Sequence, residues 1–381
     1  MEELIRVTDF QALLSEVADF AFLPPSADLQ YLIGIPRDIP NYGAVMHPGA
    51  WLEGAWLSSK HPPVIALPRM TVEFGGLNRF EGIEVRVLGD WDNPASLVTE
   101  ILEALDLPPA PRIAIGDTTS GETIVALQSL LPNATFVSAT TIVRQMRVIK
   151  SEEEIRLMRR AGEITTATYE AVCEKLQHGM TELDIVSEID FQLRLHGSLG
   201  PSFTTSLYCS GPQHPLLFGK REETWRRQLH APVSILFDFG AAYQGYCYDF
   251  GRTVFFGEPD AEFQRVYKLV MESQATGMAA MRAGQVTAAA VDRAARNVIT
   301  EAGYGEEFRH RLGHGIGLDV HEPPFLTTDD ETVLRAGMLF TVEPSIMQFD
   351  NFSARVEDVV AVREGRGEPL TTGFRELRVV D

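Results

Sequence analysis

Residues 234–256, SILFDFGAAYQGYCYDFGRTVFF, carry two acidic side chains in an otherwise apolar setting. Two β-rich runs flank Gly240 and Gly245, a pattern that predicts an antiparallel hairpin. Asp238 and Asp249 are equidistant from its centre, so we expect them directly opposite each other, with Cβ atoms about 5 Å apart. Two like charges in such a setting are destabilising without a counter-charge. The hairpin therefore predicts a positive partner for this pair of carboxylates.

Residues 338–362 repeat this arrangement. Two apolar runs flank a turn at Asp350 and Asn351, and Glu343 and Glu357 are equidistant from Asp350. The four carboxylates of the two hairpins can be balanced by two divalent cations, which bridging carboxylates hold a few Å apart. A single acidic residue in a strand usually just faces solvent, but two hairpins with the same symmetry favour a metal site.

A glycine-rich segment, residues 310–324 (HRLGHGIGLDVHEPP), contributes imidazoles. His314 lies among its glycines, with His310 and His321 on either side. A lone histidine is more often structural than a ligand, whereas three in one short segment favour a functional role. One nitrogen ligand in an oxygen-rich site favours Mn, Co, Fe or Zn over the ions that prefer oxygen alone.

The remaining sequence predicts two domains of mixed α/β class, residues 1–147 and 148–381, to position these segments. In the first we expect strands at residues 20–23, 31–35, 63–68, 84–88, 112–115 and 135–137, and helices at 94–105 and 121–131. Residues 41–63 are interpreted as a long loop that either closes its own domain or, through Trp51 to His61, contacts a partner subunit. In the second domain we expect helices from Ser151 to Gly179, from Thr181 to Gly197, and over residues 261–282 and 287–302. The first two begin with capping-box patterns.

The charge and cysteine content exclude several classes of function. Asp and Glu outnumber Lys and Arg by 53 to 33, a net charge of −20, so nucleic acid is not an expected partner. The three cysteines form no C-x-x-C pair, which fits a reducing cytoplasm. No apolar run is long enough for a membrane span, and the N-terminus lacks the features of a signal peptide.

The motifs FDFG at Asp238, YDFGRT at Asp249, GHGIG at His314, TVEPS at Glu343 and RVEDVV at Glu357 occur in the order seen in one family. The chain from about Ile149 onward resembles the M24-type "pita-bread" metallopeptidases: methionine aminopeptidase, aminopeptidase P and prolidase. PSADLQYLIGI resembles the creatinase-like N-terminal domain of the last two, which methionine aminopeptidases lack. The resemblance implies an α/β (α+β) fold. A creatinase-like α/β domain would precede a pita-bread catalytic domain with a curved antiparallel sheet flanked by helices.

The resemblance also implies a reaction, the hydrolysis of Xaa-Pro peptide bonds by a hydroxide held between two divalent metal ions per subunit. Manganese is favoured, with cobalt and zinc as alternatives. Asp238 would bind one ion, Asp249 and Glu357 both, and His314 and Glu343 the other. Glu343 would relay the proton, while His321 would stabilise the tetrahedral intermediate or hold the substrate, and His310 would line the pocket. Relatives are commonly homodimers, and the substrate is a small peptide.

The sequence departs from its relatives at two positions of the substrate pocket. Phe218 stands where relatives usually carry a histidine, and His214, four residues earlier, is a candidate replacement. Phe325 stands where some dipeptide-cleaving relatives have an arginine that pairs with the substrate carboxylate. Arg355 and Arg252 are candidates for that role, or else structural partners of the carboxylates.

Four functional hypotheses therefore stay open. A closed pocket would make a dipeptidase (prolidase), which the modest length of the chain favours, and an open groove would make an Xaa-Pro aminopeptidase acting on longer peptides. A creatinase-like enzyme would use the same fold without metal and would not need the complete ligand set. A non-catalytic binding protein on this fold would retain metal without peptidase activity.

Overall fold

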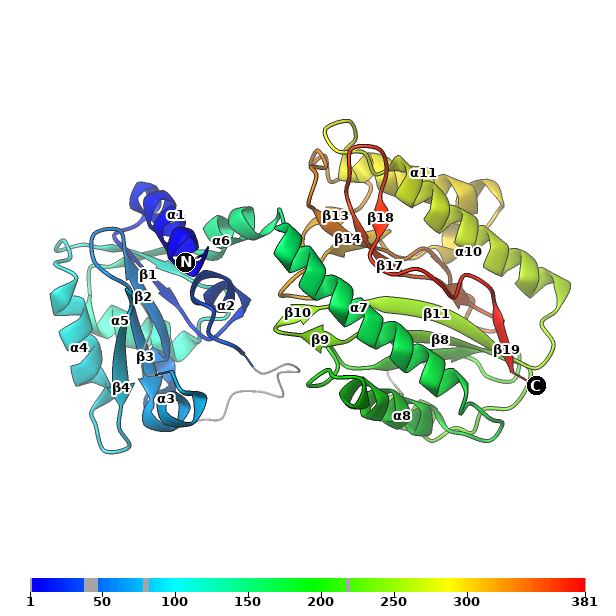
Figure 1. Ribbon diagram of the computed structural model, residues 1–381, viewed down its shortest axis with the longest axis horizontal. Helices are drawn as coiled ribbons and strands as arrows, with labels where there is room; N and C mark the ends of the chain where they lie inside the picture. The colour runs from blue at the N-terminus through cyan, green and yellow to red at the C-terminus, as the bar shows by residue number, and fades with distance from the viewer. Residues whose placement is uncertain (1, 38–46, 78–81, 217–219, 381) are drawn as a thin grey trace. The chain divides into compact units, whose positions relative to one another are not determined.

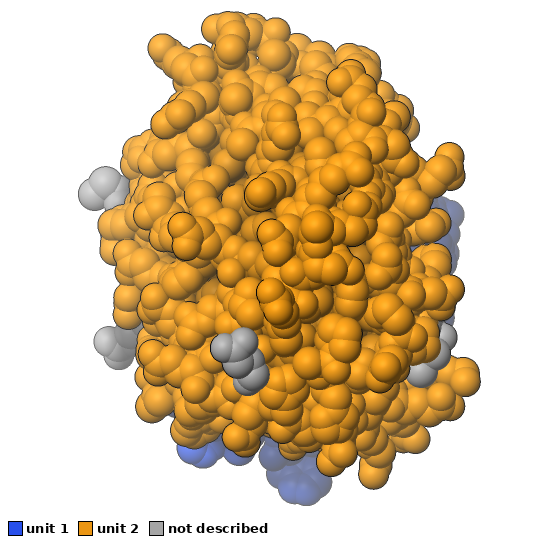
Figure 2. All heavy atoms as spheres, turned by 90° about the vertical axis from the view of Figure 1, so that its right-hand side faces the viewer, with its two compact units in different colours: residues 1–147 blue, residues 148–381 orange. Residues whose placement is uncertain are grey.

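The computed structural model describes residues 2–37, 47–77, 82–216 and 220–380. The contacts within the chain divide it into two compact units, Met1–Arg147 and Val148–Asp381 (Figures 1 and 2). Phe218, and with it the question of the missing pocket histidine, lies outside the described residues. Within the described chain, no helix is both long and apolar enough to cross a membrane.

Unit 1 contains a mixed six-stranded sheet in the order β4-β3-β2-β1-β5-β6 (Figure 1). The strands are β1 (Phe20–Leu23), β2 (Gly54–Ser58), β3 (Val64–Pro68), β4 (Glu84–Leu88), β5 (Arg112–Ile115) and β6 (Thr135–Ser138). The helices are α1 (Glu2–Val17), α2 (Ala27–Ile33), α3 (Arg69–Gly75), α4 (Pro94–Ala104), α5 (Gly121–Leu130) and α6 (Thr140–Arg147), with a 3-10 turn η1 (Ala50–Leu52). Strand β2 is antiparallel to both neighbours, whereas β3–β4, β1–β5 and β5–β6 are parallel.

The predicted loop over residues 41–63 is wrong for its second half, which forms strand β2 inside the sheet. Trp56 is fully buried; its ring lies 4.8 Å from that of Phe22, and its indole N–H donates to the carbonyl of Leu52 at 3.3 Å. The indole thus has both apolar neighbours and a partner for its one donor, as a buried tryptophan requires. Trp56, part of the segment considered for a partner contact, therefore belongs to the core, while residues 41–46 lie outside the described residues.

The strand predicted at residues 31–35 is also wrong, because the chain forms helix α2 there. The Ser26 side chain caps this helix by accepting from the Leu29 N–H, and Gly34 ends it in the left-handed conformation at φ 79°. Almost every residue of α2 is buried, so the apolar run lacks the polar face that would have revealed its helical period.

The described part of unit 2 contains two larger, mainly antiparallel sheets and two two-stranded ribbons, β9 with β10 and β15 with β16. Of the larger sheets, one has the order β19-β11-β8-β7 and the other β13-β12-β14-β17-β18. The strands are β7 (Ser206–Ser210), β8 (Val233–Phe239), β9 (Ala242–Tyr243), β10 (Tyr246–Cys247), β11 (Phe250–Phe256), β12 (Gly313–Gly315), β13 (Glu322–Leu326), β14 (Leu339–Val342), β15 (Ser345–Ile346), β16 (Ala354–Arg355), β17 (Asp358–Ala361), β18 (Glu368–Pro369) and β19 (Arg378–Val380). Within the first sheet, β19 alone is parallel to its neighbour.

The four predicted helices of unit 2 begin near the predicted residues, and the short helix α9 was not predicted. They are α7 (Glu152–Cys173), α8 (Glu182–Leu195), α9 (Arg221–Trp225), α10 (Ala261–Ala280) and α11 (Ala288–Glu301), with a 3-10 turn η2 (Gly305–Glu307). Both predicted capping boxes are present, at Ser151 with Glu154 and at Thr181 with Asp184. Helix α7 ends six residues before Gly179, since its last residue is Cys173. Helix α7 contacts β9 and β10 and helix α8 contacts β7, while α10 contacts β14 to β16 and α11 contacts β13.

The two sheets of unit 2 meet where the acidic hairpins lie. A bridge joins Gly251 to Glu357, and the Glu357 N–H donates to the Gly251 carbonyl at 2.9 Å. Apolar side chains behind this junction form one cluster, including Phe255, Phe340 and Val360, packed against α10 and α11. Burial of this cluster stabilises the strands that carry the acidic residues.

Candidate metal centre

The first acidic pair lies on β8 and immediately before β11. The register pairs Asp238 with Gly251, so Asp249 is two residues away from the position opposite Asp238. The predicted direct opposition is therefore wrong, although a two-residue offset keeps both side chains on the same face of the ribbon. A Cβ on Gly251 would lie 2.9 Å from the Glu357 Cβ. The position opposite Asp238 is thus occupied by Glu357 from the second hairpin.

The second acidic pair lies between two short ladders that share one register. Val342 pairs with Asp358 and Ser345 with Arg355, so Glu343 and Glu357 occupy facing positions, as their spacing predicted. The Glu343 N–H donates to the Leu312 carbonyl at 2.8 Å, which ties this position to the segment before β12. The chain therefore brings the carboxylates of both hairpins to the junction of the two sheets.

His314 lies on β12, between β13 and β14. A Cβ on Gly313 would stand 1.9 Å from the Thr341 carbonyl oxygen, so only glycine permits this close packing of β12 on β14. The Nδ1 of His314 lies 3.1 Å from the Gly315 carbonyl and can donate to it. That leaves Nε2 facing the cluster, at 3.5 Å from Asp249 Oδ2 and 3.4 Å from Glu343 Oε1. Metal-binding imidazoles are oriented in this way, with the second ring nitrogen bonded to a backbone carbonyl.

Three overlapping groups of side chains could each hold a cation. They are Asp238–Asp249–Glu357, His314–Glu343–Glu357 and Asp249–His314–His321, and within each group the ligand atoms lie within 4.8 Å of one another. Asp249 Oδ1 and both carboxylate oxygens of Glu357 are buried without a hydrogen-bond partner. Buried carboxylate oxygens without donors are strongly unfavourable, and a divalent cation would satisfy them.

Electrostatic repulsion among the carboxylates of the cluster also favours a bound divalent cation. Burial, together with the charges of Asp249 and Glu343, raises the pKa of Asp238 to about 7, against the opposing effect of Arg355. Burial and the neighbouring carboxylates also raise the pKa of Glu343, and that of Glu357 well above its ordinary value. Burial lowers the pKa of His314, but its hydrogen bond with Asp249 and the charges of Glu343 and Asp249 outweigh this and raise it. These residues fit a site for divalent cations, which would stabilise all of the carboxylates in their ionised form.

Arg355 lies inside the cluster, where its Nη1 contacts Asp238 Oδ2 at 2.7 Å. Arg252 is equally engaged, since its Nη2 lies 2.7 Å from Asp358 Oδ1 and its Nη1 donates to the Glu357 carbonyl. Both guanidiniums are buried and paired with carboxylates of the protein. The sequence left two roles open for these arginines, binding of the substrate carboxylate or structural pairing with carboxylates of the protein. Their contacts favour structural pairing.

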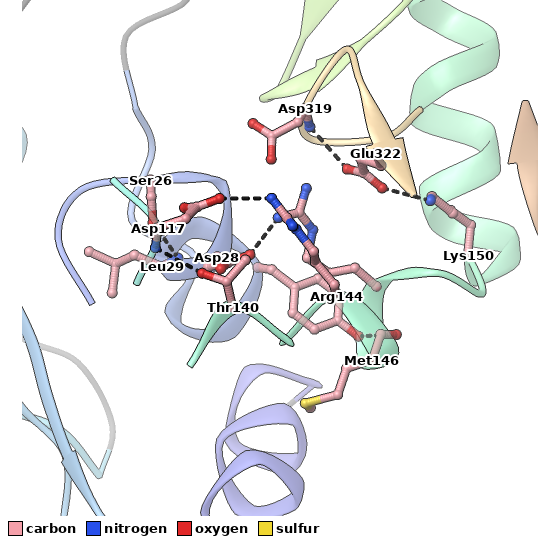
Figure 3. Close-up of polar contacts among 12 residues, drawn as sticks. Ser26, Asp28, Leu29, Asp117, Thr140, Arg144, Met146, Lys150, Asp319 and Glu322 are labelled. Carbon is pink, nitrogen blue, oxygen red and sulfur yellow. Dashed lines mark hydrogen bonds and ion pairs between the residues drawn. The ribbon is translucent and has the colours of Figure 1, made fainter. Parts of the chain in front are cut away.

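His321 is adjacent to the cluster but more exposed. Its ring lies 4.0 Å from the ring of His314, and burial, followed by the charge of His314, lowers its pKa to about 4. The next residue, Glu322, accepts from Lys150 Nζ at 2.9 Å and from the Asp319 N–H at 3.0 Å (Figure 3). Because Lys150 and Glu322 are buried, this ion pair holds the turn that presents His321.

The two other predicted pocket histidines are placed differently. His310 lies beside β15, with Nε2 2.6 Å from Ser345 Oγ and Nδ1 2.7 Å from the Arg311 carbonyl. Burial and the charge of Arg355 lower its pKa to about 3, so this ring is neutral. His214 is buried in a turn next to Gln228, whose carbonyl lies 3.3 Å from its Nε2. Among the described residues it belongs to none of the three candidate metal groups.

The sequence analysis missed several residues that support the site. Thr341 accepts from the His314 N–H at 3.0 Å and donates to Glu343 Oε1 at 3.2 Å, so it links two candidate ligands. Its position two residues before Glu343 on the same strand was a usable signal. The pair of Lys150 with Glu322 joins residues far apart in sequence, and no local pattern could have revealed it.

Comparisons with known proteins identify the family and several relatives of this chain. Residues 156–364, more than half of the chain, match metallopeptidase family M24. The Xaa-Pro dipeptidase of Pyrococcus horikoshii is 36% identical over 242 residues, 64% of this chain and 68% of that protein. The solved prolidase of Thermococcus sibiricus superimposes with a TM-score of 0.88 at 28% identity over 100% of both chains. The X-Pro aminopeptidase of Thermotoga maritima gives 0.82 at 28% identity, over 98% of this chain and 100% of that one.

These similarities confirm the predicted fold class, with helices flanking antiparallel sheets as in the pita-bread structures. They extend over essentially the whole chain and include both units. The protein is therefore a member of metallopeptidase family M24.

Proposed function

We propose that this protein hydrolyses Xaa-Pro peptide bonds, with dipeptides as its substrates and with Asp238, Asp249, His314, Glu343 and Glu357 as ligands for two divalent metal ions. The observation that supports this most strongly is the convergence of the five side chains, with buried carboxylate oxygens that lack any other partner. When bound, such cations activate water as a nucleophile near neutral pH and polarise a carbonyl group. Manganese is the favoured metal, with cobalt or zinc as alternatives.

Glu343 is the proposed proton acceptor and relay. Its Oε1 accepts from Thr341 Oγ1, which orients the carboxylate, and burial with the neighbouring carboxylates raises its pKa. A carboxylate held in this orientation beside the candidate metal site is placed to act as a general base. In this role Glu343 takes the proton that the attacking water loses and delivers it to the departing proline nitrogen.

His321 is the proposed second catalytic residue. A pKa of about 4 keeps its ring neutral at physiological pH, with one N–H available to donate. It is also the most exposed member of the three candidate groups, so an incoming carbonyl oxygen could reach it. We assign it to hydrogen bonding with that oxygen as negative charge develops there. His310 and His214 complete the proposed substrate pocket, His310 as part of its wall, whereas Arg355, a candidate for that pocket from the sequence, is paired with Asp238.

The named relatives support the substrate class. The Pyrococcus horikoshii protein is an Xaa-Pro dipeptidase and the Thermococcus sibiricus structure is a prolidase, which favours dipeptides. The X-Pro aminopeptidase of Thermotoga maritima is also similar, so longer peptides are the second candidate class of substrate. Comparing Ala-Pro with Ala-Pro-Ala separates them: a dipeptidase prefers the former, and an aminopeptidase cleaves both. We also propose that the protein is a cytoplasmic homodimer. Analytical ultracentrifugation would test its oligomeric state.

The proposal is tested with the Asp249→Asn variant and an exposed control, Asp329→Asn. We expect wild type to bind about two metal ions per chain and to lose hydrolysis of Ala-Pro in chelator. Asp249→Asn should bind fewer ions and lose activity by at least about 100-fold, while the control keeps both. Full metal binding without Xaa-Pro hydrolysis would instead support a non-catalytic binding protein, and full activity in chelator would support metal-free chemistry.

A further inference from the structure

Arg311 is an exposed arginine beside the candidate metal centre. Resting on the proposed function, we infer that Arg311 binds the C-terminal carboxylate of the dipeptide substrate. The residue thereby selects a free carboxylate next to the scissile bond.

The contacts of Arg311 place its guanidinium close to the metal ligands. Its Cζ lies 4.6 Å from the centroid of the Phe325 ring, in a cation–π arrangement. Phe325 is the cross-strand partner of His314 in the β12–β13 ladder. The ring of His321 in turn lies 4.0 Å from that of His314. The guanidinium is therefore one side chain removed from a candidate ligand and lies on the same side as the exposed histidine.

The charge of Arg311 reaches both histidines of the proposed pocket. This charge contributes to the lowered pKa values of His310 and His321, although burial has the largest effect on both. A positive charge that acts on both rings is in range of a substrate lying between them. The contact with Phe325 restrains the guanidinium, which reduces the entropy lost when the side chain binds a planar carboxylate in two-point fashion.

The other arginines around the site are already engaged. Arg355 is paired with Asp238, Arg252 with Asp358 and Arg296 with Asp292. Within the described part of the chain, Arg311 has no carboxylate partner, and its side chain makes only the contact with Phe325. The chain has a net charge of −20, so acidic partners for an arginine are abundant, yet none of the described residues pairs with Arg311. An anionic group of the substrate would supply that partner.

The geometry of a dipeptide places its carboxylate near the metal centre. The carboxylate belongs to the residue that directly follows the scissile bond, and one residue spans less than about 3.8 Å of chain. A binding group for it must therefore lie within a few Å of the carbonyl that is attacked. Arg311 lies over Phe325, the cross-strand partner of His314, which favours it for this role, whereas Arg309 lies over the ring of Phe349 beside a cavity lined by residues 347–351.

The test compares Ala-Pro with its C-terminal amide, Ala-Pro-NH2, on the metal-loaded protein. Arg311→Met should lower kcat/KM for Ala-Pro by about 10- to 100-fold, mainly through KM, and change that for the amide by less than about 3-fold. Arg311→Lys should restore part of the preference for the free acid, because it keeps the charge without the two-point geometry. Arg309→Met is the matched control and should leave the preference unchanged.

A binding measurement separates this inference from the proposed function. Calorimetric titration with proline and with prolinamide reports carboxylate recognition even if wild type hydrolyses no Xaa-Pro bond. Wild type should prefer proline, and Arg311→Met should lose that preference. The inference is overturned if Arg311→Met weakens acid and amide equally, if Arg309→Met has the same selective effect, or if wild type does not distinguish the two.

Discussion

Replacing Glu357 by Gln should stabilise the metal-free protein and at the same time remove most of its stabilisation by metal. Glu357 is buried, both of its oxygens lack a hydrogen-bond donor, and it faces Asp249, Glu343 and Asp238. Without metal, its negative charge is a source of repulsion, whereas a Gln amide could donate to the neighbouring carboxylates. With metal, the same charge is a ligand that Gln cannot replace.

The magnitude follows from the separation of the groups. Two unit charges 4.8 Å apart, the upper limit for the ligand atoms of one group, repel by about 3.5 kcal/mol at an effective dielectric constant of about 20. Attraction to Arg355 offsets part of this repulsion. We therefore expect Glu357→Gln to raise the free energy of unfolding of the metal-free protein by about 2 kcal/mol when the cluster is ionised.

The effect should depend on pH. The pKa of Asp238 is raised from 3.8 to about 7, and that of Glu357 is raised well above its ordinary value, so the folded metal-free chain binds more protons than the unfolded chain. The contribution of this cluster to the stability of the metal-free wild type should then be greatest below about pH 4 and be lost as the pH rises to about 7. At about pH 5, where the cluster holds protons, Glu357→Gln should gain little over wild type.

Urea unfolding in chelator, at about pH 5 and about pH 8, measures both effects, and repeating it with saturating Mn²⁺ measures the stabilisation by metal. Glu364→Gln, which alters an exposed carboxylate, is the control for a general change of charge. If Glu357→Gln destabilises the metal-free protein at about pH 8, or if Mn²⁺ stabilises it as much as wild type, the account of the cluster as a repulsive metal site is refuted.

Three further substitutions test individual packing contacts. Gly251→Ala places a Cβ 2.9 Å from that of Glu357, so metal content measured by atomic absorption should fall; unchanged binding would contradict the close approach of the two hairpins. Lys150→Met leaves Glu322 buried without its cation and should lower the free energy of unfolding by about 3–5 kcal/mol, whereas a loss below about 1 kcal/mol would place the pair at the surface. Trp56→Ala should cost about 3–5 kcal/mol in urea unfolding, and a negligible loss would restore the loop interpretation of residues 41–63.

The residues of the candidate site could be identified from the sequence because their signals are local. The symmetry of Glu343 and Glu357 about Asp350 predicted their register, and the structure confirms it. The capping residues Ser151 and Thr181 marked their helices in the same way, because a cap acts within three residues of itself. The motifs around the proposed ligands, and through them the resemblance to the metallopeptidases, also needed nothing beyond neighbours in the chain.

Tertiary structure alone decided which side chains meet across elements. The register of β8 and β11 placed Asp238 opposite Gly251, because Glu357 from another sheet fills the space that a side chain there would take. Trp56 was drawn into the core by partners on β1, although its Gly- and Pro-rich surroundings resemble a loop. The pairing of Arg355 with Asp238 is likewise invisible in the sequence. Distances between charges remote along the chain depend on how the sheets pack, and local residue patterns do not encode that packing.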